Sequence, residues 1–247
     1  MTNTTDTPTV VLVHGGFADA SFWAPVIRDL QASNLPVLAP ANPLRGLADD
    51  AEYVASVVRQ IDGPVLLVGH SYGGAVISVA GADAPNVVGL VYVAAFALDE
   101  GEAFAEIFER FGNTPILDAV RPSEYPVAGG GTKVELTLAP ELYKEAFAAD
   151  LPDDLIEVLA VSQRPFAAIF DERAQAAAWK TLPSWAIVAT ADNAIPPEGE
   201  RHMAERAGAQ IVEAAGASHS IALSQPKAVA DLIRTAVAGV SAEAVTA

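Results

Sequence analysis

The clearest candidate for chemistry in this sequence is Ser71, at the centre of the pentapeptide Gly69–Gly73, GHSYG. The apolar run 65–68 before it is typical of a buried strand, and residues 74–84 after it are typical of a helix. A serine on so abrupt a strand-to-helix turn has a strained backbone, which is tolerated only if the residues two positions away lack a Cβ atom. Gly69 and Gly73 meet this requirement. We therefore predict that Ser71 is a nucleophile whose Oγ lies above the strand ends.

A serine nucleophile needs a general base, and the sequence has four histidines. His70 lies inside the pentapeptide, where we expect it to pack beside the turn. His14 ends an apolar strand pattern, and we expect it to bind loop backbone, while His202 falls in a helical pattern typical of a surface. His219 lies in the loop GASHSIAL, at the carboxyl end of another strand pattern, where catalytic groups of α/β proteins gather. His219 is therefore the predicted base.

The base in turn needs a carboxylate to orient it, and two aspartates compete for this role. Asp192 directly follows the apolar run 185–189 and precedes His219 by 27 residues, which is room for one helix and one strand to return the chain. Asp99 follows an earlier strand pattern and could also approach the base. We favour Asp192 and keep Asp99 as the alternative.

Two backbone N–H groups are expected to form an oxyanion hole. One is the N–H of Tyr72, because it begins the helix after Ser71. The other is expected from the glycine loop HGGF, which follows the first strand pattern. It belongs to Gly16, or to Phe17 if the loop is turned by one residue.

Strand and helix patterns alternate through most of the chain and predict a parallel sheet. The expected strands are 9–13, 36–39, 65–68, 87–94, 185–189 and 210–213, and the expected helices are 22–32, 48–61, 74–84, 198–207 and 227–240. Ser21 is the expected N-cap of the first helix. We predict an α/β fold with about six mainly parallel strands and helices on both faces.

The alternation is interrupted between residues 98 and 180, where amphipathic helical runs, several prolines and a possible small hairpin at 126–138 occur. We interpret 98–180 as a mostly helical cap inserted into a core formed by 1–97 and 181–247. The catalytic groups would then lie between the strand ends and this cap.

Composition limits the possible partners and locations. The 247 residues contain 14 Lys plus Arg and 31 Asp plus Glu, for a formal charge of −17, which would repel phosphate backbones and anionic lipid. Cysteine is absent, so a thiol nucleophile and disulfides are excluded. No signal-peptide pattern and no apolar run of membrane-spanning length occur. We expect a cytoplasmic protein that acts on a small molecule, without nucleic acid or membrane as partner; the sequence leaves its oligomeric state open.

The motifs together resemble the α/β-hydrolase superfamily over nearly the whole chain. The segments VLVHGGFADASFW, DGPVLLVGHSYGGAVI, LVYVAAFALDEGE and ATADNAIPP are similar to small bacterial serine carboxylesterases, including pyrethroid-cleaving enzymes, and more distantly to plant methyl esterases and hydroxynitrile lyases. The resemblance implies Ser71 as nucleophile, His219 as base and Asp192 as its orienting acid. It also implies cleavage of a carboxylic ester through an acyl-enzyme, with no metal or organic cofactor.

Aromatic and apolar residues near these motifs are candidates for the substrate pocket, which would favour a largely apolar ester. They are Phe17, Trp23, Tyr72, Phe96 and Leu98 from the core, and Phe104, Phe108, Phe166 and Phe170 from the cap. Alternative functions on the same triad are hydroxynitrile lyase, perhydrolase and cofactor-free oxygenase, and a slow-turnover small-molecule receptor is a further one. None of the four lysines lies beside the triad in sequence, which disfavours a lyase that needs a cation near the leaving cyanide.

Overall fold

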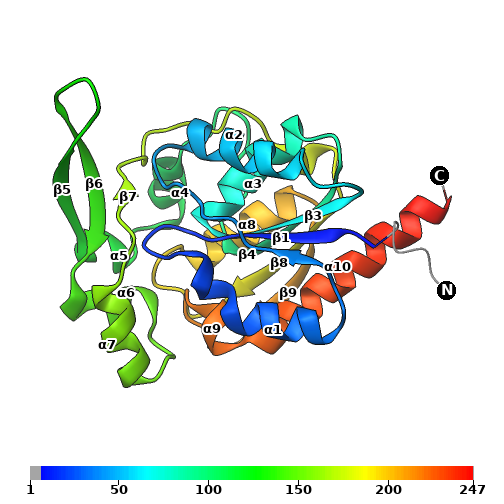
Figure 1. Ribbon diagram of the computed structural model, residues 1–247. Helices are drawn as coiled ribbons and strands as arrows, with labels where there is room; N and C mark the ends of the chain where they lie inside the picture. The colour runs from blue at the N-terminus through cyan, green and yellow to red at the C-terminus, as the bar shows by residue number, and fades with distance from the viewer. Residues whose placement is uncertain (1–6, 247) are drawn as a thin grey trace.

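The computed structural model describes residues 7–246 and contains a central sheet of six parallel strands (Figure 1). The strands are β1 (Thr9–Val13), β2 (Val37–Leu38), β3 (Val65–Ser71), β4 (Val87–Ala95), β8 (Ser184–Ala189) and β9 (Gln210–Ala214). Their order in the sheet is β2-β1-β3-β4-β8-β9. Every residue of β3 is buried, because helices cover both faces of the sheet. The predicted fold class is confirmed.

Helices lie on both faces of this sheet (Figure 1). The helices α1 (Ala24–Ala32) and α10 (Pro226–Thr246) pack against each other on one face, and α2 (Leu47–Val58) and α3 (Tyr72–Asp83) pack together on the other. Helix α8 (Pro197–Arg206) contacts β8 and β9, and the short α9 (Ile221–Ser224) contacts α1 and α10. Within residues 7–246, no helix combines the length and apolar character that crossing a bilayer requires.

The first helix begins differently from the prediction. A 3₁₀ turn, η1 (Ala20–Trp23), precedes α1, and the cap is Asp19 instead of Ser21. The Asp19 side chain accepts a hydrogen bond of 2.7 Å from the backbone N–H of Ser21. Both residue types cap helices well, so only the backbone geometry distinguishes them.

The sheet topology brings the loop after β1 and the turn after β3 together at the carboxyl ends of these strands. Strand β1 pairs with β2 on one side and with β3 on the other, so the order in which successive strands join the sheet reverses between β1 and β3. The carboxyl ends of strands at such a switch point form a crevice, in which ligands of α/β proteins bind. A Cβ atom added to Gly73 would lie 2.4 Å from the carbonyl oxygen of Val13, so the start of α3 packs directly on the end of β1.

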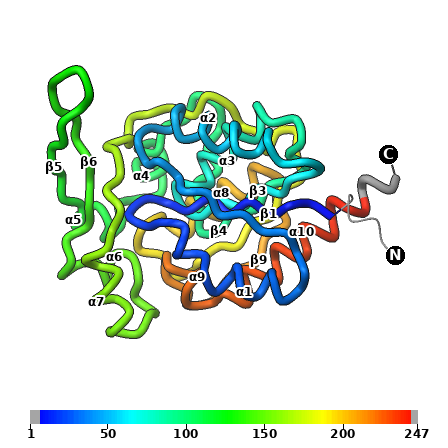
Figure 2. Tube along the Cα trace, in the orientation of Figure 1, coloured from blue at the N-terminus to red at the C-terminus, as the bar shows by residue number. Residues whose placement is uncertain are grey.

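The segment between β4 and β8 forms a separate layer over the strand ends (Figure 1). It contains the helices α4 (Phe104–Phe111), α5 (Ile116–Ala119), α6 (Tyr143–Phe147) and α7 (Asp153–Val161), the 3₁₀ turns η2 (Pro140–Leu142) and η3 (Ala178–Lys180), and an antiparallel sheet of β5 (Val120–Pro126), β6 (Thr132–Leu138) and β7 (Phe166–Ala167). In the Cα trace the β5–β6 hairpin projects from the molecule, at the end away from α10 (Figure 2). The division into core and cap stays a prediction.

The hairpin is longer than the one expected at 126–138. Strand β5 pairs with β6 along its whole length, from Val120 opposite Leu138 to Pro126 opposite Thr132. Its sequence, VRPSEYP, lacks the apolar alternation of a half-buried strand, and most of its residues are exposed. Prolines are tolerated there because β5 is an edge strand, on which an N–H group can be missing.

Candidate active site

Ser71 lies at the turn between β3 and α3 and has the strained backbone that its flanking glycines predicted. Its φ is 55° and its ψ is −126°, in a region that non-glycine residues rarely adopt. A Cβ atom on Gly69 would lie 2.4 Å from the carbonyl oxygen of Gly73, so the turn can close only without that atom. The Ser71 side chain faces a cavity, and 8% of the residue is exposed.

The glycine loop after β1 lies against this serine. A Cβ atom on Gly15 would lie 2.6 Å from Cβ of Ser71, and one on Gly16 would lie 2.9 Å from the ring of Phe166. Phe17 has a φ of 60° and lines the same cavity as Ser71. Within residues 7–246 the backbone N–H groups of Gly16, Phe17 and Tyr72 have no protein acceptor. Unpaired backbone N–H donors of the glycine loop and of the start of α3 thus lie around Ser71.

His219 and Asp192, 27 residues apart in sequence, form a buried pair. Nδ1 of His219 lies 2.5 Å from Oδ2 of Asp192, and both side chains are almost completely buried. Oδ1 of Asp192 accepts hydrogen bonds from the N–H groups of Ala194 (2.6 Å) and Ile195 (2.9 Å). Because the aspartate accepts at Nδ1–H, the neutral His219 ring presents the lone pair of Nε2.

In the part of the chain that the structure describes, Nε2 of His219 is buried and has no hydrogen-bond partner. His219 is close to the turn of Ser71, because its backbone carbonyl lies 2.9 Å from Nε2 of His70, the residue before the serine. The edge of the Phe147 ring contacts the His219 ring at 4.8 Å between centroids, and Phe147 lines the cavity of Ser71. A free imidazole nitrogen therefore lies next to the serine turn.

The other three histidines are held by separate contacts. His70 stacks on Phe22 at 4.4 Å, and burial holds its pKa well below the usual value, so the ring is neutral. Nε2 of His14 accepts a hydrogen bond from the N–H of Asn42, and its Nδ1 then donates to the carbonyl oxygen of Gly15. The predicted backbone contact of His14 is confirmed. His202 contacts Arg110 on the partly exposed side of α8.

The rival acid, Asp99, has a different partner. Its carboxylate forms an ion pair of 2.5 Å with Lys180 and accepts a hydrogen bond from the N–H of Glu100. The bond to Lys180 is the main cause of its lowered pKa. Of the two aspartates considered, it is Asp192 that the structure pairs with His219.

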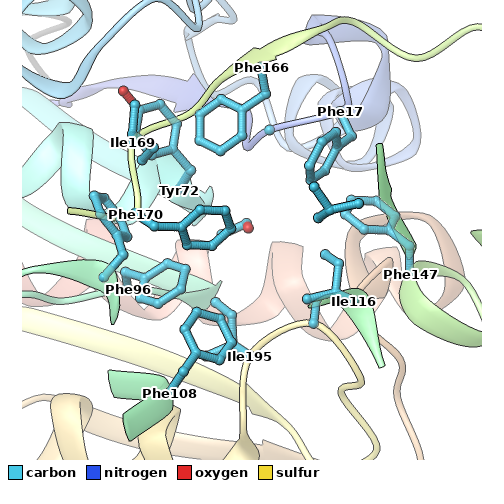
Figure 3. Close-up of a pocket in the computed structure, with 15 residues that line it drawn as sticks. Phe17, Tyr72, Phe96, Phe108, Ile116, Phe147, Phe166, Ile169, Phe170 and Ile195 are labelled. Carbon is cyan, nitrogen blue, oxygen red and sulfur yellow. The ribbon is translucent and has the colours of Figure 1, made fainter. Parts of the chain in front are cut away.

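The cavity over Ser71 is almost entirely apolar. Its volume is about 50 Å³, which is room for about four water-sized groups. Figure 3 shows aromatic rings from the core and from the segment between β4 and β8 arranged around it. The fifteen lining residues, all uncharged, are Gly16, Phe17, Ser71, Tyr72, Phe96, Phe104, Phe108, Ile116, Val120, Phe147, Phe166, Ile169, Phe170, Ala194 and Ile195.

Two residues expected in the pocket, Trp23 and Leu98, do not line it. Trp23 is fully buried at the end of η1, where its ring packs against Phe22 and His70 behind the serine turn. Leu98 is also fully buried, and its carbonyl oxygen accepts a hydrogen bond from the indole of Trp179. Both belong to the core, since each side chain is covered on every side.

The sequence patterns did not identify several other residues of the site. Phe147, on α6, lines the cavity and contacts His219, but nothing near it in sequence marks it as functional. The hydroxyl of Tyr72 donates a hydrogen bond of 2.7 Å to the buried Asp50, which orients a cavity wall. Burial raises the pKa of both groups. Buried Glu200 on α8 accepts a hydrogen bond from the N–H of Ala189, and burial, followed by the charge of Asp192, raises its pKa.

The chain is similar in sequence to proteins named as esterases and hydrolases. The chain is 28% identical over 246 residues to pyrethroid hydrolase of Sphingobium wenxiniae, covering 91% of this chain and 85% of that protein. It is 25% identical over 241 residues to polyneuridine aldehyde esterase of Rauvolfia serpentina, covering 89% of this chain and 91% of that protein. It is 26% identical to putative methylesterase 11, chloroplastic, of Arabidopsis thaliana, but the match spans only 62% of that longer protein.

Solved structures share the fold. The crystal structure of polyneuridine aldehyde esterase superposes with a TM-score of 0.81 at 23% identity, covering 93% of this chain and 99% of that chain. A pyrethroid hydrolase from Sphingobium faniae superposes with a TM-score of 0.76 at 22% identity, covering 93% and 97%. The sequence profile described as "Alpha/beta hydrolase family" matches residues 10–232, which is most of the chain. The chain therefore belongs to the alpha/beta hydrolase family.

Proposed function

We propose that this protein is a serine carboxylesterase that cleaves a small, largely apolar ester through an acyl-enzyme. The observation that carries the proposal is the buried pair of His219 and Asp192, with Nε2 of His219 unpaired beside the strained turn of Ser71. This combination of a nucleophile that faces a cavity, a free base and an orienting carboxylate is what acyl transfer to a serine requires.

In the first step, Oγ of Ser71 attacks the ester carbonyl while Nε2 of His219 takes its proton. Asp192 stabilises the imidazolium that forms, through the bond to Nδ1–H. Nε2 of His219 has no hydrogen-bond partner within residues 7–246, so its bond to Oγ of Ser71 is not formed in the structure. Catalytic hydrogen bonds are often long in free enzymes and shorten when substrate binds.

The negative charge that develops on the carbonyl oxygen would be stabilised by backbone N–H groups. We assign one donor to Tyr72, at the start of α3, and the second to Gly16 or Phe17. Losing one such donor typically costs about 3 kcal/mol of transition-state stabilisation. His219 then returns the proton to the departing alcohol, which leaves an acyl ester on Ser71.

Hydrolysis of the acyl-enzyme uses the same groups in reverse. Water attacks the acyl carbonyl, Nε2 of His219 takes a proton from the water, and the proton passes to Oγ of Ser71 as the acid departs. These steps are proton and acyl transfers, for which the side chains and backbone donors named above suffice. Segment 98–180 would act as the cap, since it supplies Phe104, Phe108 and Phe166 to the cavity.

The lining of the cavity supports an uncharged, apolar group on one side of the ester. Fifteen uncharged residues surround a volume of about 50 Å³, so a short acyl or alcohol group fits, and a charged one would lose its solvation without a partner. The relatives named as methylesterase, polyneuridine aldehyde esterase and pyrethroid hydrolase support ester cleavage as the reaction class.

The test is hydrolysis of p-nitrophenyl esters of graded acyl length by the purified protein and by Ser71→Ala. We expect steady turnover of the short esters and a loss of about 10⁴-fold or more in Ser71→Ala, because the nucleophile is removed. Ser56→Ala is the matched control, since this serine lies on α2, away from the cavity, and its hydroxyl donates to the carbonyl oxygen of Tyr53. Labelling of Ser71 without release of acid would indicate a receptor instead, and turnover that survives in Ser71→Ala would overturn the proposal.

A further inference from the structure

Glu200, on α8, is a buried carboxyl group that the proposed reaction does not use. Only 3% of the residue is exposed, whereas Glu198, two residues earlier on the same helix, is exposed to solvent. A buried ionised carboxylate is costly unless its oxygens are paired with donors or it takes up a proton. The contacts of Glu200 decide between these two states.

One oxygen of Glu200 is satisfied and the other is not. Oε2 accepts a hydrogen bond of 3.1 Å from the backbone N–H of Ala189, at the end of β8. Oε1 is buried, and none of residues 7–246 provides a donor for it. The carboxylate of Asp192 lies near enough to raise the pKa of Glu200. Because two ionised carboxylates in a buried site repel each other, we expect one of them to carry a proton.

The surroundings indicate that the proton is on Glu200. Asp192 already receives donors on both oxygens, from His219 at Oδ2 and from two backbone N–H groups at Oδ1, which favours its ionised form. Burial, and then the charge of Asp192, raise the pKa of Glu200 well above its usual range. A protonated Glu200 would satisfy its own unpaired oxygen by donating to Asp192.

The other charged and titratable groups near Glu200 do not reverse this order. Arg201, the next residue on α8, lowers the pKa of Glu200 only weakly, and its guanidinium pairs with Glu213. Tyr92, from β4, lines a small cavity together with Glu200, but the Tyr92 hydroxyl is hydrogen-bonded to Ser78. His219, from the loop after β9, reaches Glu200 only through Asp192.

We propose that Glu200 is a positioning residue that stays protonated and donates a hydrogen bond to Asp192. This bond holds the carboxylate of Asp192 against His219 and limits the basicity of the His219 imidazole. The inference rests on the proposed function, in which His219 is the general base. A donor on Asp192 withdraws charge from the bond to Nδ1–H, so it lowers the proton affinity of the imidazole. Loss of the donor should make His219 more basic.

The test compares the pH dependence of kcat/KM in three variants. Glu200→Gln keeps a neutral donor for Asp192 and an acceptor for Ala189, so its acidic limb should match that of the wild type within about 0.2 pH unit. Glu200→Met removes the donor, and its acidic limb should move upward by about one pH unit. Glu198→Gln removes an exposed carboxylate two residues away and controls for the general loss of charge.

Two results would overturn the inference. A downward shift in Glu200→Gln would mean that an ionised carboxylate had been lost, and identical limbs in all variants would mean that Glu200 only fills space. The same comparison is made without turnover in the Ser71→Ala protein, by following the His219 ring protons in NMR titrations. Because these titrations need no ester hydrolysis, failure of the proposed function and failure of this inference give different results.

Discussion

Oγ of Ser220 donates a hydrogen bond of 2.8 Å to the backbone carbonyl oxygen of Phe147, and so ties the loop of His219 to the segment between β4 and β8. On the other side of His219, the N–H and hydroxyl of Ser218 both donate to the carboxylate of Asp150. Both neighbours of the proposed base are therefore attached to residues 147–150. The position of His219 depends on a part of the chain about 70 residues earlier.

The first prediction concerns this attachment. Asp150→Ala should lower kcat/KM for a short nitrophenyl ester about three- to tenfold, because the loop of His219 loses two hydrogen bonds and the base moves from its working position. The control is Asp153→Ala, which removes a nearby exposed carboxylate paired with Lys144. Equal activity of the two variants would mean that the attachment does not position the base.

The second prediction separates the two candidate acids. Asp192→Asn should lower kcat on the order of 10³- to 10⁴-fold, because the amide does not hold the His219 ring in the tautomer with a free Nε2. Asp99→Asn should stay within about twofold of the wild type, since Asp99 pairs with Lys180 near the surface, where such pairs contribute little. Steady-state kinetics of both variants test this, and the reverse ranking would remove Asp192 from the mechanism.

The third prediction concerns Phe17, which lines two cavities. One is the cavity of about 50 Å³ over Ser71, and the other is a groove of about 280 Å³ beside η1 and α7. Phe17→Ala keeps the backbone N–H but joins the two spaces, so the ratio of kcat/KM for octanoyl over acetyl esters should rise about tenfold. Leu155→Ala is the control, because Leu155 lines the groove and is not among the residues around the cavity over Ser71. An unchanged ratio would show that the long chain does not pass Phe17.

The fourth prediction is a pH dependence of stability. Burial holds the pKa of His70 well below 6.5 in the folded protein, while the unfolded chain titrates near 6.5. As the pH falls below 6.5, the unfolded state binds the extra proton, so His70 makes the free energy of unfolding fall by up to ~1.4 kcal/mol per pH unit.

His70→Gln isolates this contribution. The glutamine can keep a donor to the carbonyl oxygen of His219 but cannot titrate, so its stability should fall less steeply between pH 6.5 and 5. Other titrating groups, including His14 and Glu200, are common to both proteins and cancel in the comparison. Urea denaturation at pH 7.5, 6.5 and 5.5 gives the two slopes, and parallel curves would contradict a neutral, buried His70.

The local features of the site could be predicted because each depends on neighbours in the chain. The turn at Ser71 needs glycine at 69, because a Cβ atom there would meet the carbonyl oxygen of Gly73, a clash within five residues of chain. His219 and Asp192 each follow a strand pattern, and the carboxyl ends of parallel strands meet at one edge of a sheet. The six-stranded sheet followed from the same alternation of strands and helices.

The cavity wall and the second layer around the triad depended on contacts between distant segments. Trp23 and Leu98 are near the catalytic motifs in sequence, yet the packing of the core covers them, whereas Phe147 reaches His219 from α6. Glu200 is one of several acidic residues on α8, and only its burial against Asp192 distinguishes it from Glu198. A short sequence pattern reflects local backbone geometry and periodicity. Burial and the pairing of polar atoms arise from the folded chain as a whole, so they become visible only in three dimensions.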